Sequence, residues 1–184
     1  PRRDVQVLTP MHRGPAGTLA LNQLLQAALN PSGPSIEHHG QTLREGDKVL
    51  QLKNDYDKEV YNGDLGVITR VSVDERRLTV RFDNHDVEYQ DADLDTLTLA
   101  YATSIHKSQG SEYPAVVIPL LTAHFLMLSR NLVYTAVTRG KKLCVLVADP
   151  RALKLALVET RREERVTRLA ERLSAATYGT VLVL

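Results

Sequence analysis

The sequence predicts an α/β domain that is interrupted by a small antiparallel β-barrel. In the first and last thirds of the chain, apolar runs typical of buried parallel strands alternate with segments of helical periodicity. The middle third instead holds short β-type runs separated by turn residues, as expected of an antiparallel barrel. Charge follows the same division, because residues 40–98 have a net charge of −6 and residues 99–148 one of +4. An acidic middle between neutral or basic ends is typical of an inserted domain.

The first third predicts one strand and one helix. Residues 4–9 form a short β-type run. The next apolar positions fall on one face of a helix, which we expect to be buried: Leu21, Leu24, Leu25 and Ala28. The sequence Asn-Pro-Ser-Gly-Pro at residues 30–34 is a strong break that ends this helix.

The middle third predicts several short strands. Four β-type runs occupy residues 48–52, 66–71, 77–82 and 87–89. Polar turn sequences separate them at residues 62–64, 74–75 and 83–84. Runs of this length and spacing predict a small antiparallel barrel, which we place at residues 40–96.

The last third returns to alternating strands and helices. Three apolar runs predict buried parallel strands at residues 97–101, 115–118 and 143–147. One helical face holds Leu132, Val133, Ala136 and Val137, and a second holds Val166, Leu169, Ala170 and Leu173. Residues 145–150 are interpreted as a plain strand end and turn. We therefore expect residues 1–39 and 97–175 to form one discontinuous α/β domain, followed by a β-type tail of unexplained role at residues 176–184.

One cysteine and the lack of long apolar runs exclude several classes of protein. Cys144 lies in an apolar run and is expected to be a small buried hydrophobe. A single cysteine excludes an internal disulfide framework and a cysteine-cluster metal site; no other metal site is predicted, and a reducing cytoplasm is the most compatible compartment. No run approaches the roughly 18 apolar residues of a membrane span, so no membrane association is expected. Because the chain begins at Pro1, we expect it to be part of a longer polypeptide.

Chemically active side chains cluster after the predicted strands, where α/β folds place their sites. The first strand is followed by a glycine-bearing loop at residues 10–17 that contains Arg13. A guanidinium matches the oxygens of a phosphate, so this loop can present Arg13 to one. On this loop alone, an ordinary surface arginine in a strand-to-helix turn is the favoured interpretation.

A second loop, at residues 102–112, is rich in hydrogen-bond donors. It contains hydroxyls, an imidazole, an amide and a glycine, and Lys107 is its only formal cation. Such a loop suits a phosphate or a nucleic-acid backbone. The alternative is structural, because Thr103 or Ser104 could simply cap a helix.

A third stretch, at residues 131–142, predicts a helix with Thr135 and Arg139 on one face. Arg139 lies directly before Gly140, which has the sequence character of a helix C-cap. Its structural role would be to stabilise the end of the helix dipole. Its functional role would be an arginine finger on the γ-phosphate of a nucleotide.

Together these stretches resemble the superfamily 1 DNA helicases, most closely the RecD-like branch that includes the exonuclease V α subunit. Residues 7–14 (Val-Leu-Thr-Pro-Met-His-Arg-Gly) are similar to helicase motif IV, and residues 21–26 and 29–31 continue the pattern. Residues 100–112 are similar to motif V, and residues 132–139 (Leu-Val-Tyr-Thr-Ala-Val-Thr-Arg) to motif VI. The resemblance runs from about residue 4 to about residue 173, and motifs V and VI are highly specific in this order and spacing.

The resemblance implies the second of two RecA-like motor domains, a parallel-sheet lobe of the P-loop NTPase fold, with an inserted SH3-like β-barrel. By this resemblance, Arg13 and Arg139 would act as catalytic residues that approach the γ-phosphate of ATP across the cleft between the motor domains. Gly110 and Glu112 would lie near the nucleotide, with Glu112 toward its ribose.

The resemblance also implies contacts to the backbone of single-stranded DNA from Thr103, Ser104 and His106, and we count Lys107 with them. Ser104 stands where relatives usually carry threonine, which keeps the hydroxyl and loses a methyl group. In the barrel, Tyr61 and Asn62 form a polar and aromatic cluster with Lys53, Tyr56 and Lys58 that could guide single-stranded DNA. Because the segment is acidic, packing against a protein or a purely structural role is an equal alternative.

The expected function is that of the C-terminal part of an ATP-dependent DNA helicase, which translocates 5′ to 3′ and unwinds duplexes in recombination and repair. The polarity comes from the family alone. The sequence lacks a G-x-x-x-x-G-K-[ST] phosphate loop, so Mg²⁺ and the main cradle for ATP would come from the N-terminal motor domain of the same polypeptide. The chain alone is not expected to hydrolyse ATP. Other expected partners are subunits of a recombination or repair complex.

One alternative function is a non-catalytic adaptor on the same fold, which binds nucleic acid or protein through the barrel. Such an adaptor would not need Arg13 and Arg139 to face a common cleft. A Rossmann-type dinucleotide binder is excluded, because no G-x-G-x-x-G turn follows a predicted strand.

Overall fold

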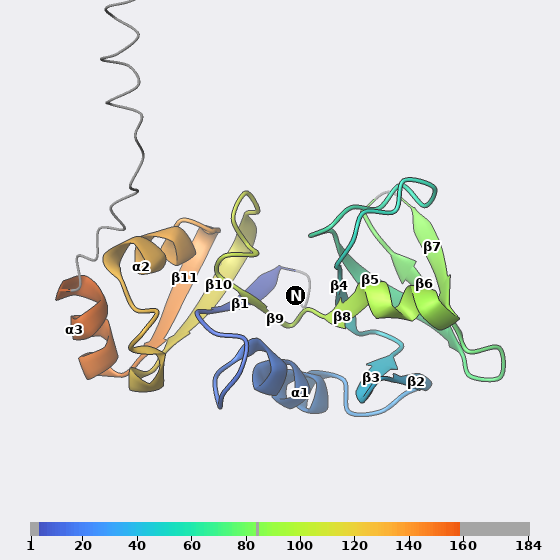
Figure 1. Ribbon diagram of the computed structural model, residues 1–184, viewed down its shortest axis with the longest axis horizontal. Helices are drawn as coiled ribbons and strands as arrows, with labels where there is room; N and C mark the ends of the chain where they lie inside the picture. The colour runs from blue at the N-terminus through green and yellow to red at the C-terminus, as the bar shows by residue number, and fades with distance from the viewer. Residues whose placement is uncertain (1–3, 84, 159–184) are drawn as a thin grey trace, which may run out of the picture.

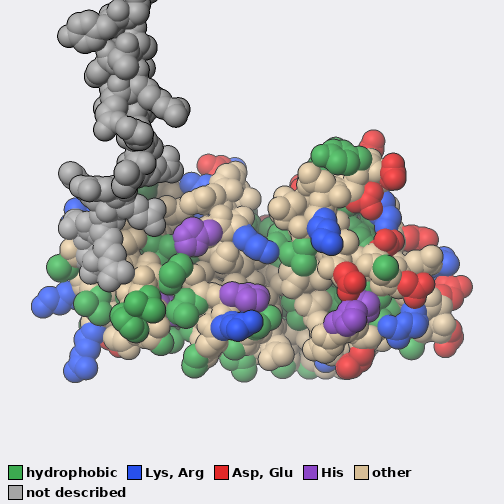
Figure 2. Space-filling model, in the orientation of Figure 1, with side chains coloured by type: hydrophobic (Ala, Val, Ile, Leu, Met, Phe, Trp, Pro, Cys, Tyr) green, Lys and Arg blue, Asp and Glu red, His purple; other side chains and the backbone are tan. Residues whose placement is uncertain are grey.

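The structure of the protein is a computed structural model that describes residues 4–83 and 85–158. Two lobes lie side by side, one built on a parallel sheet and the other on an antiparallel sheet (Figure 1). Figure 2 shows acidic side chains gathered over the antiparallel lobe, as the charge division along the sequence predicts. Within the described residues, no helix has the length and apolar character needed to cross a membrane.

The parallel lobe confirms the predicted α/β fold. Its strands are β1 (Val5–Thr9), β9 (Ala102–Ser104), β10 (Tyr113–Leu120) and β11 (Gly140–Ala148). They lie in the order β11-β10-β1-β9, and every neighbouring pair is parallel. The chain leaves this sheet after β1 and returns at β9, so the whole antiparallel lobe is inserted between two adjacent parallel strands.

Two helices pack beside β10 and β11 and complete the apolar core of the parallel lobe. Helix α2 (Arg130–Val137) contacts both strands, and α3 (Pro150–Val158) packs against α2 and the short 3-10 turn η2 (Thr122–His124). Ser129 caps α2 by accepting a hydrogen bond from the Leu132 backbone N–H. Of the predicted face of α2, three residues are buried and Val137 is partly exposed.

The antiparallel lobe confirms the predicted barrel. A two-stranded hairpin joins β2 (Ser35–His38) and β3 (Gln41–Arg44). A five-stranded sheet follows in the order β7-β6-β5-β4-β8. Its elements are β4 (Lys48–Gln51), β5 (Leu65–Ser72), β6 (Arg77–Arg81), β7 (Asp86–Gln90), the 3-10 helix η1 (Asp91–Thr96) and β8 (Leu97–Leu99). These strands enclose a separate apolar core around Val49, Ile68, Leu78 and Tyr89.

The predicted buried face of the first helix is wrong. Helix α1 (Thr18–Leu29) instead buries Thr18, Asn22 and Gln26, while Leu24 is 63 % exposed. The reason is its position over the junction of the two lobes (Figure 1), where Asn22 bonds backbone groups of Leu99 and Ala102 and Gln26 donates to the carbonyl of Thr42. Amide side chains on the helix satisfy those groups, and leucine cannot do so.

The interpretation of residues 97–101 as one parallel strand is also wrong. β8 pairs antiparallel with β4 inside the barrel, and β9 pairs parallel with β1 in the other lobe. Ala100 and Tyr101 carry the chain between the two sheets and are both buried. A continuous apolar run indicates that a segment is buried, but it does not determine which strands the segment pairs with in a sheet.

β11 is parallel to β10 as predicted, but it is not a buried strand. It lies at the edge of the described sheet, and Leu143 and Val147 are each 56 % exposed. Cys144 is only half-buried, so it is less buried than the sequence predicts, and burial raises the pKa of its thiol.

Among the elements that sequence reasoning missed are helix α3 and the β2–β3 hairpin, and two segments that it predicted lie outside the described residues. Residues 145–150 are not a plain turn, because Asp149 accepts a hydrogen bond from the Arg151 backbone N–H and Pro150 begins α3. Aspartate followed by proline is a helix-start signal that could have found this helix. The helix predicted at residues 166–173 and the tail at 176–184 lie outside the described residues.

Candidate nucleotide and nucleic-acid site

The loop that carries Arg13 follows β1 and is fixed by local hydrogen bonds. Thr9 donates its hydroxyl to the carbonyl of Ala16 at 2.5 Å, and His12 Nδ1 lies 2.7 Å from Thr18 Oγ1. These contacts hold both ends of the loop, while Arg13 itself is exposed. The loop therefore presents its guanidinium to solvent from a rigid base.

Gly17 is required for the compact shape of this loop. A Cβ at this position would lie 2.5 Å from the carbonyl oxygen of Arg13 and 2.6 Å from that of His12. Both obstacles are backbone atoms, so they cannot move away as a side chain would. The glycine thus sets the path of the loop around Arg13.

The second donor-rich loop leaves β9, which is the neighbour of β1 in the sheet, with Thr9 beside Ser104. Ser104 accepts a hydrogen bond from the Lys107 backbone N–H at 3.2 Å, so this hydroxyl stabilises a turn, whereas the structural alternative predicts that it caps a helix. His106 and Lys107 are exposed, and Ser104 is half-buried. Thr103 is only 6 % exposed, so its side chain is closed to a DNA backbone in this conformation.

Arg139 links helix α2 to the far end of the same loop. Its Nη1 donates to the carbonyl of Ser111 at 3.0 Å, and its Nε donates to the carbonyl of Thr135 at 3.2 Å. Nη2 donates to the hydroxyl of Thr138 at 3.2 Å. A guanidinium has five N–H donors, so these contacts leave capacity for an anion. The structural role at the end of α2 and a site for phosphate are therefore compatible.

Gly110 and Glu112 lie beside Arg139 in the chain path that leads into β10. Gly110 has φ +87°, a backbone conformation that favours glycine, and it is exposed. Glu112 forms an exposed ion pair with Lys141 at 3.0 Å, a contact of small energetic value. Arg139 and Glu112 thus flank one loop at the amino ends of β10 and β11.

Arg13 lies toward the opposite end of the parallel strands from Arg139. It follows the carboxyl end of β1, whereas Arg139 precedes the amino end of β11, and these strands belong to one parallel sheet. The structure therefore groups Arg139 with Gly110 and Glu112, and it groups Arg13 with the start of the loop after Ser104.

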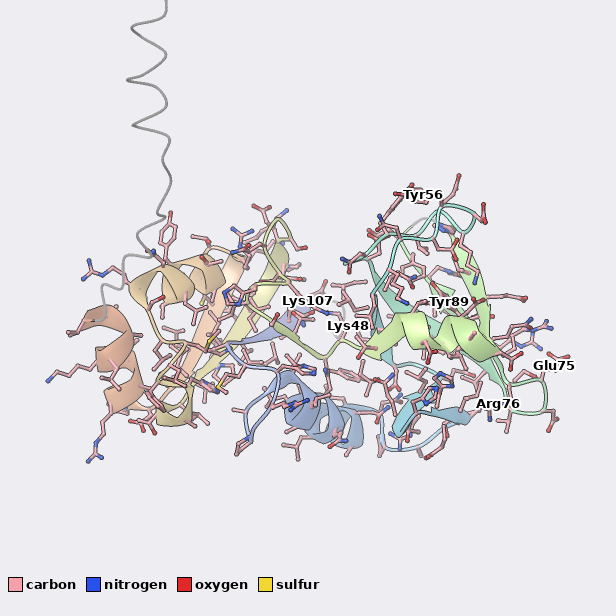
Figure 3. All side chains as sticks on the ribbon, viewed as in Figure 1. Lys48, Tyr56, Glu75, Arg76, Tyr89 and Lys107 are labelled. Atoms are coloured by element: carbon pink, nitrogen blue, oxygen red, sulfur yellow. The ribbon has the colours of Figure 1, made fainter. Side chains whose placement is uncertain are left out.

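A groove of about 320 Å³ separates the second loop from the barrel, and Figure 2 shows the surface hollowed there between the lobes. Ser111, Glu112 and Tyr113 line one side, and the barrel contributes Asp64 and Lys48 to the other. Figure 3 places Lys48 and Lys107 at this junction. The groove has mixed charge, so it is not a simple anion pocket.

Lys48 is an unusual cation, because it is almost completely buried between the lobes. Its ammonium donates to Gln6 Oε1 at 2.8 Å and lies 6.0 Å from the centre of the Tyr113 ring. Burial lowers the pKa of Lys48 to about 8, against an opposing effect of Asp4. Burial also raises the pKa of Tyr113.

The predicted aromatic cluster of the barrel is a projecting loop between β4 and β5, and Figure 3 shows Tyr56 at its tip. Tyr56 and Tyr61 are exposed, and their rings meet edge to face with centres 6.1 Å apart. The backbone N–H of Asn62 donates to Asn54 Oδ1. Lys58 pairs with Asp93, so it is not a free cation for this cluster.

Comparison with known protein families identifies both lobes. Residues 21–82 match the family model described as the ATP-dependent RecD-like DNA helicase SH3 domain, and residues 99–147 match the UvrD-like helicase C-terminal domain. The ATP-dependent RecD2 DNA helicase of Deinococcus radiodurans is 44 % identical over 171 residues. The chain belongs to the RecD-like helicases of superfamily 1.

A further RecD relative agrees with this family, and a solved structure has the same fold. The RecBCD enzyme subunit RecD of Haemophilus influenzae is 31 % identical over 176 residues. Each of these two relatives matches 93 % of this chain, which spans only 24 % and 26 % of their lengths. A Bacteroides Pif1 helicase in complex with ADP-AlF3 and single-stranded DNA has the same fold, with a TM-score of 0.59, 20 % identity, and coverage of 92 % of this chain and 44 % of that one.

The polar contacts that join the lobes of this RecD-like chain were missed by sequence reasoning. Asp47 in the barrel is fully buried and accepts hydrogen bonds from three side chains: Gln26 at 2.5 Å, Asn30 at 2.7 Å and Tyr101 at 2.9 Å. We call these four residues the Asp47 network. One signal was available, because Asn22, Gln26 and Asn30 are spaced four residues apart and so share one helical face.

Proposed function

We propose that this chain supplies the second motor lobe and the SH3-like barrel of an ATP-dependent DNA helicase of RecD type. In this role β1, α1 and the segment from β9 to α3 form the motor lobe, and the segment from β2 to β8 forms the barrel, so the expected boundaries at residues 39 and 97 shift by a few positions. ATP would bind between this lobe and the N-terminal motor domain of a longer polypeptide. Single-stranded DNA would be moved 5′ to 3′ during duplex unwinding, in recombination or repair with the corresponding complex subunits.

The observation that supports this proposal best is the position of Arg139. Its guanidinium bridges the end of α2 and the loop at Ser111, so it links the two segments that resemble motifs VI and V. Two carbonyls and one hydroxyl orient it, and unused donors remain. A positive charge held in this way can stabilise the charge that develops on a transferred γ-phosphate once a second lobe delivers the nucleotide.

The other nucleotide contacts follow from the same loop. Because Gly110 has no side chain, a ligand can approach its backbone closely, and Glu112 nearby in the chain is exposed. Arg13 follows the carboxyl end of β1, at the opposite end of the strands from Arg139, on the loop fixed by Thr9 and Gly17. We propose that Arg13 and Arg139 approach the γ-phosphate from different sides, so that hydrolysis depends on closure of the two motor domains.

The DNA contacts would come from the first half of the donor-rich loop and from the barrel. Ser104, His106 and Lys107 present a hydroxyl, an imidazole and an ammonium close together along the chain. Thr103 is buried in β9, and we assign it a supporting role there. Tyr61 and Asn62 on the projecting barrel loop would extend the path for single-stranded DNA by stacking and hydrogen bonding.

Mg²⁺ would be held mainly by the N-terminal motor domain. Asp149, the acidic residue at the end of β11, has its carboxylate engaged at the start of α3. The described loops near Arg139 offer arginine, glycine and a paired glutamate, a set that suits a nucleotide rather than a magnesium ion. ATP supplies the phosphoryl group, and this chain contributes the charge that stabilises its transfer.

The test uses the longer protein that carries this chain, with Arg139→Ala and Arg139→Lys. Both should lower DNA-stimulated ATP hydrolysis by about 10³-fold or more, because lysine cannot reproduce the guanidinium geometry. Nucleotide binding, measured with a fluorescent ATP analogue, should stay within a few-fold. ATP hydrolysis at the wild-type rate in either variant would remove the proposed role.

A matched control separates catalysis from folding. Arg151→Ala removes an exposed arginine on α3 and should leave hydrolysis unchanged. Thermal unfolding of the Arg139 variants measures the loss of the contacts to Ser111 and Thr135. If ATP hydrolysis returned in Arg139→Ala under conditions that restored its stability, Arg139 would have a structural role alone and its role on the γ-phosphate would be removed.

A further inference from the structure

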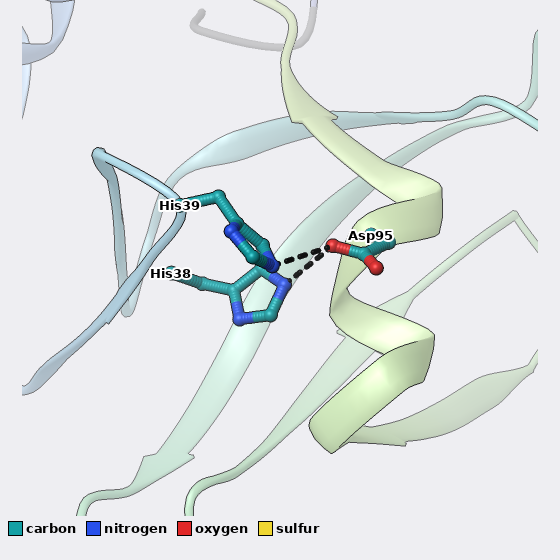
Figure 4. Close-up of side chains that lie close together, drawn as sticks. All are labelled: His38, His39 and Asp95. Atoms are coloured by element: carbon teal, nitrogen blue, oxygen red, sulfur yellow. Dashed lines mark hydrogen bonds and ion pairs between the residues drawn. The ribbon is translucent and has the colours of Figure 1, made fainter.

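A cluster of possible metal ligands lies on the barrel, away from the motif loops. One histidine ends strand β2, the next lies in the turn of the β2–β3 hairpin, and an aspartate comes from η1, which is distant in the sequence (Figure 4). The three residues are His38, His39 and Asp95, and their ligand atoms all lie within 4.8 Å of one another. Among the described residues this is the group whose donors could hold a metal ion.

The hairpin turn directs both imidazoles toward the same carboxylate. His38 pairs with Gln41, so only His39 and Gly40 form the turn, with φ +47° and +75°. Positive φ at both central residues is typical of a type I′ turn, where asparagine followed by glycine is favoured. A histidine in the first position departs from that preference and places its ring over η1 (Figure 4).

The distances suit coordination of one ion. Asp95 Oδ1 lies 2.7 Å from His38 Nε2 and 3.4 Å from His39 Nε2. Tetrahedral bonds of about 2.0–2.2 Å place neighbouring donor atoms roughly 3.3–3.6 Å apart. The distance from Asp95 Oδ1 to His39 Nε2 already has that value. The distance to His38 Nε2 would need to lengthen by less than about 1 Å.

We propose that His38, His39 and Asp95 bind one divalent transition-metal ion of the Zn²⁺ class. Two imidazole nitrogens and one carboxylate oxygen are ligands that Zn²⁺ accepts, whereas Mg²⁺ and Ca²⁺ prefer oxygen donors throughout. The side chains of His39 and Asp95 are 77 % and 54 % exposed, so an ion can reach them from solvent. A water molecule would complete the tetrahedral set.

The ion would connect two segments of the barrel that are far apart in the chain. His38 and Asp95 are separated by 57 positions. η1 continues directly into β8, which pairs with β4, and then into the crossing to the motor lobe. Binding at this site would therefore fix the hairpin to the segment that leads back to the parallel sheet, and it would stabilise the folded barrel by mass action.

The test titrates the full chain, without a histidine tag, with Zn²⁺ by calorimetry and with Co²⁺ by visible absorption. We expect one saturable site per chain, a d–d absorption band of tetrahedral Co²⁺, and a rise in melting temperature with Zn²⁺. His39→Asn keeps a residue that tolerates positive φ and removes one ligand, so it should weaken binding at least tenfold. Asp95→Asn should do the same.

His106→Ala is the matched control, since it removes an exposed histidine from the motor lobe. It should leave Zn²⁺ affinity unchanged. Absence of saturable Zn²⁺ binding in the wild-type chain, or equal affinity in wild type and His39→Asn, would overturn the proposal and leave a hydrogen-bonded histidine pair.

Discussion

Gln26 on helix α1 donates a 2.5 Å hydrogen bond to the buried carboxylate of Asp47 in the barrel. This contact joins two lobes that have separate apolar cores. Asn30 reaches the other carboxylate oxygen, and Tyr101 donates to it from the crossing segment. The barrel is therefore positioned on the motor lobe by directional hydrogen bonds, which specify one orientation more narrowly than apolar packing does.

Loss of this carboxylate should destabilise the whole chain. Asp47→Ala removes the carboxylate that accepts one hydrogen bond each from Gln26, Asn30 and Tyr101, and hydrogen bonds to a charged group are worth about 1.5–3 kcal/mol each. We expect a loss of about 3 kcal/mol or more in the free energy of unfolding, measured by urea titration. Asp57→Ala, at an exposed position, should change it by less than about 0.5 kcal/mol. A small effect of Asp47→Ala would mean that other contacts hold the lobes.

Most barrel strands, three strands of the parallel sheet and the motif loops could be predicted from the sequence because local signals define them, whereas the β2–β3 hairpin and the division between β8 and β9 could not. Turn residues delimit the barrel strands, and the loop after β9 carries its donors in consecutive positions. The buried face of α1 could not be predicted in this way. Asn22 forms hydrogen bonds with backbone groups of Leu99 and Ala102, and these groups lie beside the helix only after the two lobes have assembled. The pairing of His38 with Asp95 has the same origin, since long-range proximity has no local signature.

The buried Lys48 should make stability depend on pH. Burial lowers its pKa from 10.5 to about 8, so between these values the unfolded chain binds more protons than the folded chain. Stability therefore rises as the pH increases through this window. Relative to Lys48→Met, which cannot titrate, the wild type should gain on the order of 2–3 kcal/mol between about pH 8 and pH 10.5. Urea unfolding at both limits measures this difference.

The Lys48 prediction is tested with Lys48→Met and controlled with Lys142→Met. Lys142→Met removes an exposed lysine on β11, and its stability difference from wild type should be the same at both limits. A constant difference between wild type and Lys48→Met would show that Lys48 titrates normally despite its burial.

Gly17→Ala should distort the loop that presents Arg13. The new Cβ would meet two backbone carbonyls at 2.5 and 2.6 Å, and the loop must shift to remove the overlap. We expect a loss of about 1–3 kcal/mol in the free energy of unfolding. Gly14→Asn is the comparison, because its Cβ would meet no atom within 4 Å and asparagine tolerates positive φ. If Gly14→Asn cost more than Gly17→Ala, the close approach at Gly17 would not be the controlling feature.

Tyr61→Ala should weaken binding of single-stranded DNA by the longer protein that carries this chain. Tyr61 and Tyr56 expose their rings on the projecting loop of the barrel, and base stacking on an aromatic side chain is worth about 1–3 kcal/mol. That energy corresponds to a dissociation constant roughly 5- to 150-fold higher, measurable by fluorescence anisotropy with a labelled oligonucleotide. Tyr61→Phe keeps the ring and should bind within about twofold of wild type, whereas Phe125→Ala removes an exposed ring from the motor lobe and should have no effect. Because the barrel is acidic, equal affinity in wild type and Tyr61→Ala would indicate that this loop packs against protein rather than DNA.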